Sequence, residues 1–211
     1  RNRQVFKILS PFKIIGVAVL WNIASYATIS FSGSYQAKEL GFSSTFSSII
    51  IMAGSFIRVL FSRPMGKLAD KYSFSKMLYV CFSIAAIAYG INMFTMPGNG
   101  KVLYFIHYVL YCIAMAGINS AMVNLIYDYV DYERRTSALA LNQSLSGFPG
   151  FLTTLLLSKL LGFIQNNGNS LLGISVYAQQ VMSGISFLIA VVLIIYMFAV
   201  VRKIPSKRDL K

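Results

Sequence analysis

Four polar aromatic side chains, Tyr104, His107, Tyr108 and Tyr111, recur within an otherwise apolar stretch of the chain. Their spacing of i, i+3, i+4 and i+7 places them on one face of a helix, and such a face is expected to line a cavity. His107 is the only histidine. An imidazole titrates near neutral pH, so His107 is a candidate for relaying a proton or binding a solute. A hydrogen-bonded histidine that only packs is the favoured interpretation of this residue taken alone.

A second group of candidate side chains lies near the start of the chain. Asn22 and Tyr26 form an i, i+4 pair, and Trp21 beside them can stack on a sugar or aromatic ring or simply fill space. The candidate substrate-path residues are therefore Trp21, Asn22, Tyr26, Tyr104, His107 and Tyr111.

Arg58 is a charged residue inside the end of a long apolar run. A cation within a membrane-spanning segment is a functional candidate, because burying its charge is costly. The alternative is that the long side chain extends to the nearby membrane surface, where its charge is hydrated.

Catalytic chemistry has little support in the sequence. No Gly-x-Ser-x-Gly element accompanies the single histidine, and no carboxylate lies midway along an apolar run. Cys81 and Cys112 lack metal-ligand spacing, and a nucleotide-binding phosphate loop is missing from the sequence. We therefore expect no enzyme activity, no metal and no cofactor; an intramembrane enzyme is the less favoured alternative.

The composition is that of a membrane protein. Hydrophobic residues make up 56% of the 211 residues and charged residues only 12%, against about 25% charged in an ordinary soluble domain. The net charge of +13 does not indicate nucleic-acid binding, because the basic residues separate apolar runs instead of covering a surface.

The long apolar runs predict an all-α polytopic protein with a single domain of six transmembrane helices, since about 20 apolar residues cross a bilayer. The expected spans are 13–37, 42–61, 77–97, 102–126, 137–163 and 171–201. Sixteen of the 19 basic residues fall on the side of the two termini, and the others are Lys38, Lys101 and Lys159. The positive-inside rule therefore places both termini in the cytoplasm.

The six spans differ in polarity. The first and fourth are rich in hydrogen-bonding groups, whereas the third is mostly apolar and residues 185–200 of the sixth carry almost nothing polar. Polar groups avoid hydrocarbon, so the first and fourth spans are expected to border an aqueous interior and the third and sixth to meet lipid. This order is that of a repeat of three helices.

Two cytoplasmic connections carry most of the acids. Residues 62–76 read as a short basic loop, and residues 127–136 form a second charged cluster before the fifth span. Acids near a helix start favour its dipole, and arginines can pair with carboxylates across the loops. We expect a conformational latch between the two, with plain solvation as the alternative. Its candidate residues are Gly66, Asp70, Lys71, Lys76, Asp128, Asp131, Glu133, Arg134 and Arg135.

A possible bend lies in the fifth span. Gly147, Pro149 and Gly150 make a thin segment in which proline interrupts the helical hydrogen bonds. A kink with no gating role is equally compatible with these residues.

Three segments carry a family resemblance. Gly66-x-Leu68-Ala69-Asp70-Lys71-Tyr72 is similar to the signature loop of major facilitator superfamily transporters. Ser73 replaces that pattern's second glycine, as in the second copy of the loop. Residues 147–150 resemble the superfamily's Gly-Pro helix motif. Asp128-Tyr-Val-Asp131-Tyr-Glu133 resembles a run in the glycoside–pentoside–hexuronide:cation symporters, without their basic residue in the next helix.

The resemblance implies a fold and an activity. It implies the carboxy-terminal half of a secondary transporter, a six-helix unit with a 3+3 inverted repeat that moves a small solute by alternating access. Spans one and four would line the cavity, spans two and five would meet the missing amino-terminal half, and spans three and six would face lipid. The expected partners are the lipid bilayer, a small-molecule substrate and a coupling ion, H⁺ or Na⁺, in the plasma (inner) membrane. The alternatives are a six-helix channel and a homodimeric membrane protein.

Overall fold

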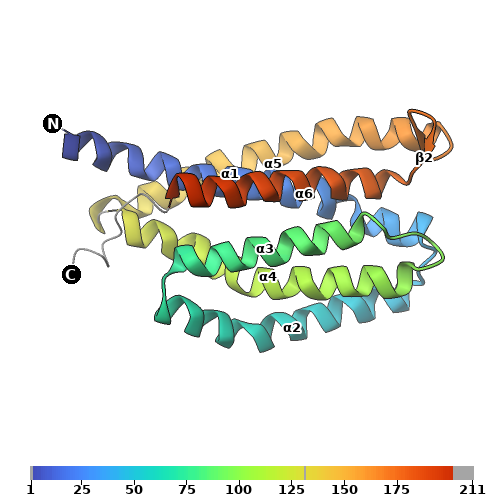
Figure 1. The fold of residues 1–211 in the computed structure, drawn as a ribbon, viewed down its shortest axis with the longest axis horizontal. Coiled ribbons are helices and arrows are strands. Elements are labelled where there is room, and N and C mark those ends of the chain that lie inside the picture. Colours follow the sequence, from blue (N-terminus) through green and yellow to red (C-terminus); the bar gives the residue numbers. More distant parts are fainter. Residues whose placement is uncertain (1, 131, 202–211) are drawn as a thin grey trace.

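The computed structural model describes residues 2–130 and 132–201, with side chains from residue 13 onward except that of Tyr129. Six long helices lie side by side along one axis (Figure 1). They are α1 (Asn2–Ser34), α2 (Ser44–Lys71), α3 (Phe74–Asn92), α4 (Gly100–Tyr129), α5 (Arg135–Asn166) and α6 (Ala178–Ala199). A π-helical turn, η1 (Tyr35–Glu39), extends α1, and a 3₁₀ turn, η2 (Tyr132–Arg134), precedes α5.

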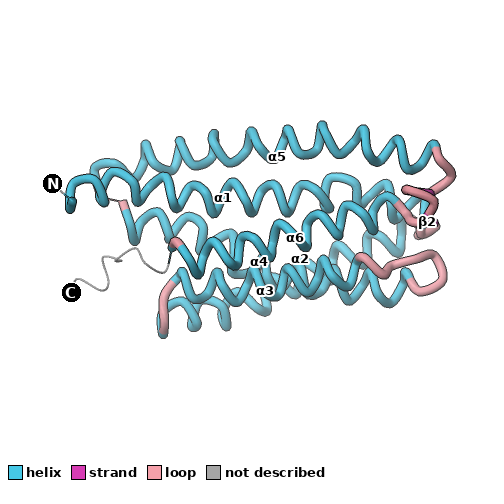
Figure 2. The backbone as a smooth tube through the Cα atoms, turned by 45° about the horizontal axis from the view of Figure 1, so that its top comes forward, coloured by secondary structure: helices cyan, strands magenta, loops and turns pink. Residues whose placement is uncertain are grey.

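All six helices are long and apolar enough to cross a membrane. The prediction of an all-α polytopic protein is confirmed, and 86% of the described residues are helical. The only strands in the described residues are β1 (Ser170–Leu171) and β2 (Ile174–Ser175), an antiparallel pair between α5 and α6. The short connections alternate between the two ends of the bundle (Figure 2).

The helix pairings repeat in two halves. Helix α1 packs mainly on α5 and α6, whereas α4 packs mainly on α2 and α3, and α3 and α6 join the two groups. Exchanging α1 with α4, α2 with α5 and α3 with α6 leaves this pattern unchanged. Helices α1 and α4 run in opposite directions (Figure 1). The packing therefore has the pattern of an inverted repeat of three helices.

Small side chains bring α3 and α4 close together in the largest core cluster. Ala85, Ala88, Ala114 and Ala121 are fully buried there. A Cβ atom on Gly117 would lie 2.5 Å from the Cys81 sulfur, so only glycine fits at this crossing. Close backbone approach over small residues is the usual means of packing helices in membranes, where burial from water supplies no driving force between them.

Hydrogen bonds join the first half of α6 to α1 and α3. Asn92 donates to Ser183 over 2.7 Å, and Gln180 donates to the Thr95 carbonyl over 3.0 Å. Thr28 and Ser186 hydroxyls lie 2.6 Å apart. The expectation that the sixth span is apolar and peripheral therefore holds only beyond Ser186, because the buried polar residues of α6 end there.

The basic stretch 62–76 is mostly helical, which corrects the expectation of a loop. Helix α2 continues to Lys71 with Pro64 inside it, and only Tyr72 and Ser73 connect it to α3. The Ser73 hydroxyl accepts a hydrogen bond from the Lys76 backbone N–H over 3.2 Å. Serine at this position therefore caps α3, which glycine could not do through a side chain.

The helix ends also differ from the expected span limits elsewhere. Helix α3 begins earlier and ends earlier than 77–97, because Ser73 caps it at Phe74 and Asn92 ends it. The β1–β2 hairpin occupies the expected start of the sixth span, where positive backbone angles at Gly168 and Gly173 turn the chain.

Candidate functional site

The candidate residues on α4 lie inside the bundle. Tyr104, His107 and Tyr111 are 1%, 3% and 4% exposed. The His107 Nδ1–H donates to the Ala88 carbonyl of α3 over 2.8 Å. The Tyr111 and Ser25 hydroxyls lie 3.2 Å apart, which links α4 to α1. These three side chains join α4 to α1 and α3, and in this conformation they do not line an open surface.

Tyr104 extends the same polar interior toward the end of α1. Its hydroxyl accepts a hydrogen bond from Gln36 over 2.8 Å, and its ring lies 5.6 Å from the His107 ring and 6.4 Å from the Tyr108 ring. The helical spacing that grouped these aromatic residues was correct. Their face, however, packs against α1 and α3.

The candidates on α1 separate into a buried one and two more accessible ones. Trp21 is 5% exposed and packs on Phe82 of α3, with ring centroids 5.4 Å apart. Asn22 is half-buried, and Tyr26 is 45% exposed. Trp21 therefore points away from the surface that Tyr26 reaches.

Tyr26 lies against the predicted bend of α5. A Cβ atom on Gly150 would lie 2.9 Å from the Tyr26 ring, so the absence of a side chain makes room for that ring. Pro149 lies inside the helix, and Gly147 has open space around it. One turn further along, Ser30 of α1 and Thr154 of α5 are in hydrogen-bond contact at 2.9 Å. The structure thus brings Tyr26 and Gly150 together, which the sequence did not predict.

One end of the bundle holds most of the described charges. We call it the basic end; it comprises residues 62–76 and 127–136, and α1 begins and α6 ends there (Figure 2). The Lys71 and Lys76 ammonium groups lie 5.1 Å and 5.4 Å from the centroid of the Tyr72 ring. A Cβ atom on Gly66 would meet no neighbour within 4 Å, so this glycine does not serve a close helix approach.

Asp70 does not join the two sides of the expected latch in this conformation. Asp70 is exposed and has neither a hydrogen bond nor an ion pair with any described residue. Arg135 donates to the Tyr127 carbonyl over 3.0 Å and lies over the Tyr127 and Tyr132 rings. Glu133 and Arg134 are exposed. Asp128 is half-buried and has an interaction partner, while Asp131 lies outside the described residues.

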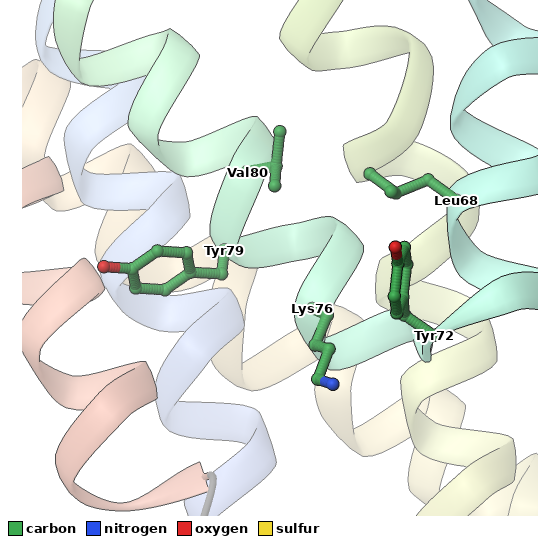
Figure 3. Close-up of a pocket in the computed structure, with 5 residues that line it drawn as sticks. All are labelled: Leu68, Tyr72, Lys76, Tyr79 and Val80. Carbon is green, nitrogen blue, oxygen red and sulfur yellow. The ribbon is translucent and has the colours of Figure 1, made fainter.

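A shallow hollow of about 310 Å³ opens at the basic end between α2 and α3 (Figure 3). Leu68, Tyr72, Lys76, Tyr79 and Val80 line it. The surface of the hollow is mostly apolar, and Lys76 is the one charged residue among the five that line it. A lining of this kind is poorly suited to a polar solute, which needs several converging hydrogen-bonding groups.

Arg58 lies beside α4, next to the Cys112 thiol and near Tyr108 and Tyr111. The residue is half-buried, and its Nε atom is buried without a hydrogen-bond partner. Gly54, one turn earlier in α2, packs directly on the Tyr108 ring and on the Cys112 sulfur. Arg58 is therefore placed by a close crossing of α2 and α4.

Within the described residues, no group of three or more His, Cys, Asp or Glu side chains could hold a metal ion. Cys81 and Cys112 are buried free thiols. Neither residue is placed for metal coordination.

Sequence reasoning missed the polar contacts of α6 and the far end of α1. Gln179 donates to the Thr28 carbonyl over 3.0 Å, and Gln165 donates to Glu39 over 2.8 Å. The spacing of Gln179, Ser183 and Ser186 is that of one helical face and would have indicated a buried polar face. The contact between Gln165 and Glu39 joins distant segments and leaves no local sequence pattern.

Comparison with known proteins identifies a family for this chain. No curated protein matches the chain. A family model described as Major Facilitator Superfamily matches residues 1–154. The matched part contains the first four helices and the beginning of α5, and with them both charged connections. On this match, and with six apolar helices in an inverted 3+3 packing, the chain belongs to the Major Facilitator Superfamily, whose members are membrane transporters.

Proposed function

We propose that this chain is the carboxy-terminal half of a secondary transporter that moves a small solute by alternating access. The observation that carries the proposal is the unequal burial of the helices. In the most apolar stretch of α2 and of α5, only 11% of the residues are buried. The corresponding share is 50% for α1 and 44% for α3 and α4. Two symmetry-related helices are thus left open, as expected if a complementary six-helix half covers them.

The exposed side chains of α2 and α5 support the same arrangement. Met52 and Phe56 of α2 are each 68% exposed, and Phe148 and Phe151 of α5 are 63% and 60% exposed. Beyond Ser186, α6 also exposes apolar side chains, such as Leu188 and Ile195. In the proposed transporter, α2 and α5 meet the complementary half, whereas α3 and α6 meet lipid.

The proposed substrate path follows the more accessible polar groups. Asn22 and Tyr26 on α1 remain candidates for solute contact. Trp21, Tyr104, His107 and Tyr111 are buried in this conformation, so a role in solute binding would require α1, α3 and α4 to separate. We therefore assign these four residues to the packing of the half.

The basic end is proposed to lie in the cytoplasm of a cell whose plasma membrane holds the transporter. Exposed cations at this end include Arg63, Lys67, Lys71 and Lys76, whereas the opposite end has Lys38, Lys101 and Lys159. An excess of basic residues near the ends of spans is typical of the cytoplasmic side.

The latch is proposed to form in the other access state. Asp70 is free of described partners here, so a rocking motion could bring it to Arg134 or to the start of α5. Replacing Asp70 by Asn should lower the transport rate while leaving the melting temperature unchanged, because the carboxylate is exposed in this state. The exposed Lys67→Gln is the matched control. Normal transport by the Asp70→Asn variant would remove the latch from the mechanism.

The driving force is proposed to be a gradient of H⁺ or Na⁺. The run Asp128 to Glu133 supports the cation-symporter branch, although its Asp131 lies outside the described residues. The experiment is uptake into vesicles that contain the full-length protein bearing this chain. A mixture of small metabolites is supplied outside, and mass spectrometry identifies those that accumulate.

The expected result is accumulation of at least one solute, which stops when both ion gradients are collapsed. Accumulation that survives the collapse would exclude ion coupling but leave transport intact. Equal uptake by protein-containing and protein-free vesicles would contradict the transport function itself.

A further inference from the structure

Arg58 lies halfway along α2, which extends from Ser44 to Lys71. At 1.5 Å per residue, about 20 Å of helix separates it from each end. The sequence placed Arg58 near the end of its span because residues 62–71 read as a loop. Since these residues are helical, Arg58 is further from the basic end than expected.

The Arg58 side chain points away from the basic end. Gly54 packs against Tyr108 and Cys112, and Met65, further along α2, packs against Gly117, further along α4. Helices α2 and α4 therefore run parallel, and these contacts show which residues lie at the same level. The neighbours of Arg58 are Tyr108, Tyr111 and Cys112, which are level with Gly54. A side chain extending toward the basic end would instead reach the level of Gly117. Arg58 therefore follows the usual tilt of helical side chains toward the helix start.

The charge of Arg58 is uncompensated within the described residues. The described acids, Glu39, Asp70, Asp128 and Glu133, all lie at or near helix ends. No described carboxylate pairs with Arg58, and its buried Nε has no acceptor. The surrounding hydroxyls and thiol carry no formal charge. A guanidinium at membrane depth is costly unless a partner neutralises it.

We propose that Arg58 binds the anionic group of the transported solute, a carboxylate or a phosphate. The planar guanidinium has a rigid set of N–H donors that matches two oxygens of such a group. Arg58 is half-buried on α2, and in the proposed transporter this helix faces the complementary half. The ligand would therefore approach from between the halves and contact the guanidinium beside Tyr108.

This inference deepens the proposed function and rests on it, because it assumes that α2 borders the solute path. Binding and transport can nevertheless be measured separately. The test uses the purified full-length protein and follows its melting temperature with added ligands. Matched probe pairs differ in charge but little in shape: glucuronate with glucose, and lactate with glycerol. Inorganic phosphate is a fifth probe, all at constant ionic strength.

The expected result is stabilisation by at least one anionic probe and by neither neutral counterpart. Arg58→Gln should weaken that binding at least about tenfold, because a charge-assisted pair is lost. Arg58→Lys should bind with intermediate strength, since it keeps the charge but not the fork. Arg63→Gln, at an exposed position of the same helix, is the matched control and should bind as the wild type does.

A second measurement needs no ligand. If Arg58 awaits a solute, Arg58→Gln should leave the melting temperature of the ligand-free protein unchanged or raise it. If Arg58 instead pairs with a carboxylate of the complementary half, the same variant should melt at a lower temperature, and this would overturn the proposal. The proposal also fails if no anionic probe gives a response that depends on Arg58. Uptake of a neutral solute by Arg58→Gln at the normal rate would remove the anion site while leaving the transport function intact.

Discussion

His107 lies in the first third of α4 and Arg58 midway along α2, and their surroundings are opposite. His107 is 3% exposed and its ring nitrogen has a hydrogen-bond acceptor on α3. Arg58 is half-buried, and its Nε has no acceptor within the described part of the chain. The His107 nitrogen is satisfied by a backbone carbonyl of this chain, whereas no described residue satisfies the Nε atom of Arg58.

The contrast separates two uses of polar residues in a membrane. The groups around His107 join α1, α3 and α4 and can keep the half rigid while it moves. Arg58 lies on the sparsely covered helix α2, where an uncompensated charge has no packing purpose. Polar character alone therefore does not identify a solute path; the presence or absence of partners does.

The largest expected effect comes from adding a side chain at Gly54, where α2 and α4 cross closely and position Arg58. A Cβ atom on Gly54 would overlap the Tyr108 ring and lie 2.7 Å from the Cys112 sulfur. Gly54→Leu should therefore separate α2 from α4, lowering the free energy of unfolding by about 3 kcal/mol and abolishing anion binding. Thermal melting and the probe titrations measure the two effects.

Gly66→Leu is the matched control for that change. Gly66 lies on the same helix with open space around it, so added atoms meet no neighbour. Equal loss of stability in the two variants would show that the crossing at Gly54 is not specifically close-packed.

A smaller effect is expected when His107, whose ring nitrogen already has a hydrogen-bond partner, is replaced. His107→Leu loses the hydrogen bond to the Ala88 carbonyl, and this should lower the free energy of unfolding by about 1–2 kcal/mol. The folded fraction should still bind the anionic probes with wild-type affinity. Full stability combined with lost binding or transport would reverse the assignment of His107 to packing.

The smallest effect concerns one hydrogen bond between α3 and α6. Asn92 and Ser183 are buried and 2.7 Å apart. A double-mutant cycle with Asn92→Ala and Ser183→Ala should give a coupling energy of about 0.6 kcal/mol, the usual size for such bonds in membranes. A coupling of zero would mean that the two helices meet there by packing alone.

The sequence was sufficient for the helices because long apolar runs have few alternatives in a bilayer. It also identified the correct face of α4, since Tyr104, His107 and Tyr111 do lie together. It did not show which neighbour that face meets, because periodicity describes one helix and burial depends on several. The interior position of Trp21 on Phe82 was unpredictable for the same reason.

The basic stretch shows a different limit of sequence reading. Pro64 and the cations around it suggested a loop, but Pro64 lies inside α2. Proline is tolerated in membrane helices because neighbouring groups and water can satisfy the backbone carbonyl that it leaves unpaired. That error shortened the second span and moved Arg58 toward a membrane surface. The position of Arg58 followed only from the helix bounds and from its neighbours on α4.

The central claim is that α2 faces the complementary half across the solute path between the two halves, while α6 beyond Ser186 borders lipid. Both expose apolar side chains, so exposure alone does not distinguish them. A water-soluble maleimide does, because it reacts with thiolates in contact with water. Single cysteines at Met52, Phe56, Leu188 and Ile195 would be labelled in the full-length protein in membranes, with Cys81 and Cys112 replaced by alanine.

We predict that cysteines at Met52 and Phe56 react and that an anionic solute changes their rates, whereas those at Leu188 and Ile195 stay unreactive. Rapid labelling at Leu188 and Ile195 with none on α2 would contradict the account.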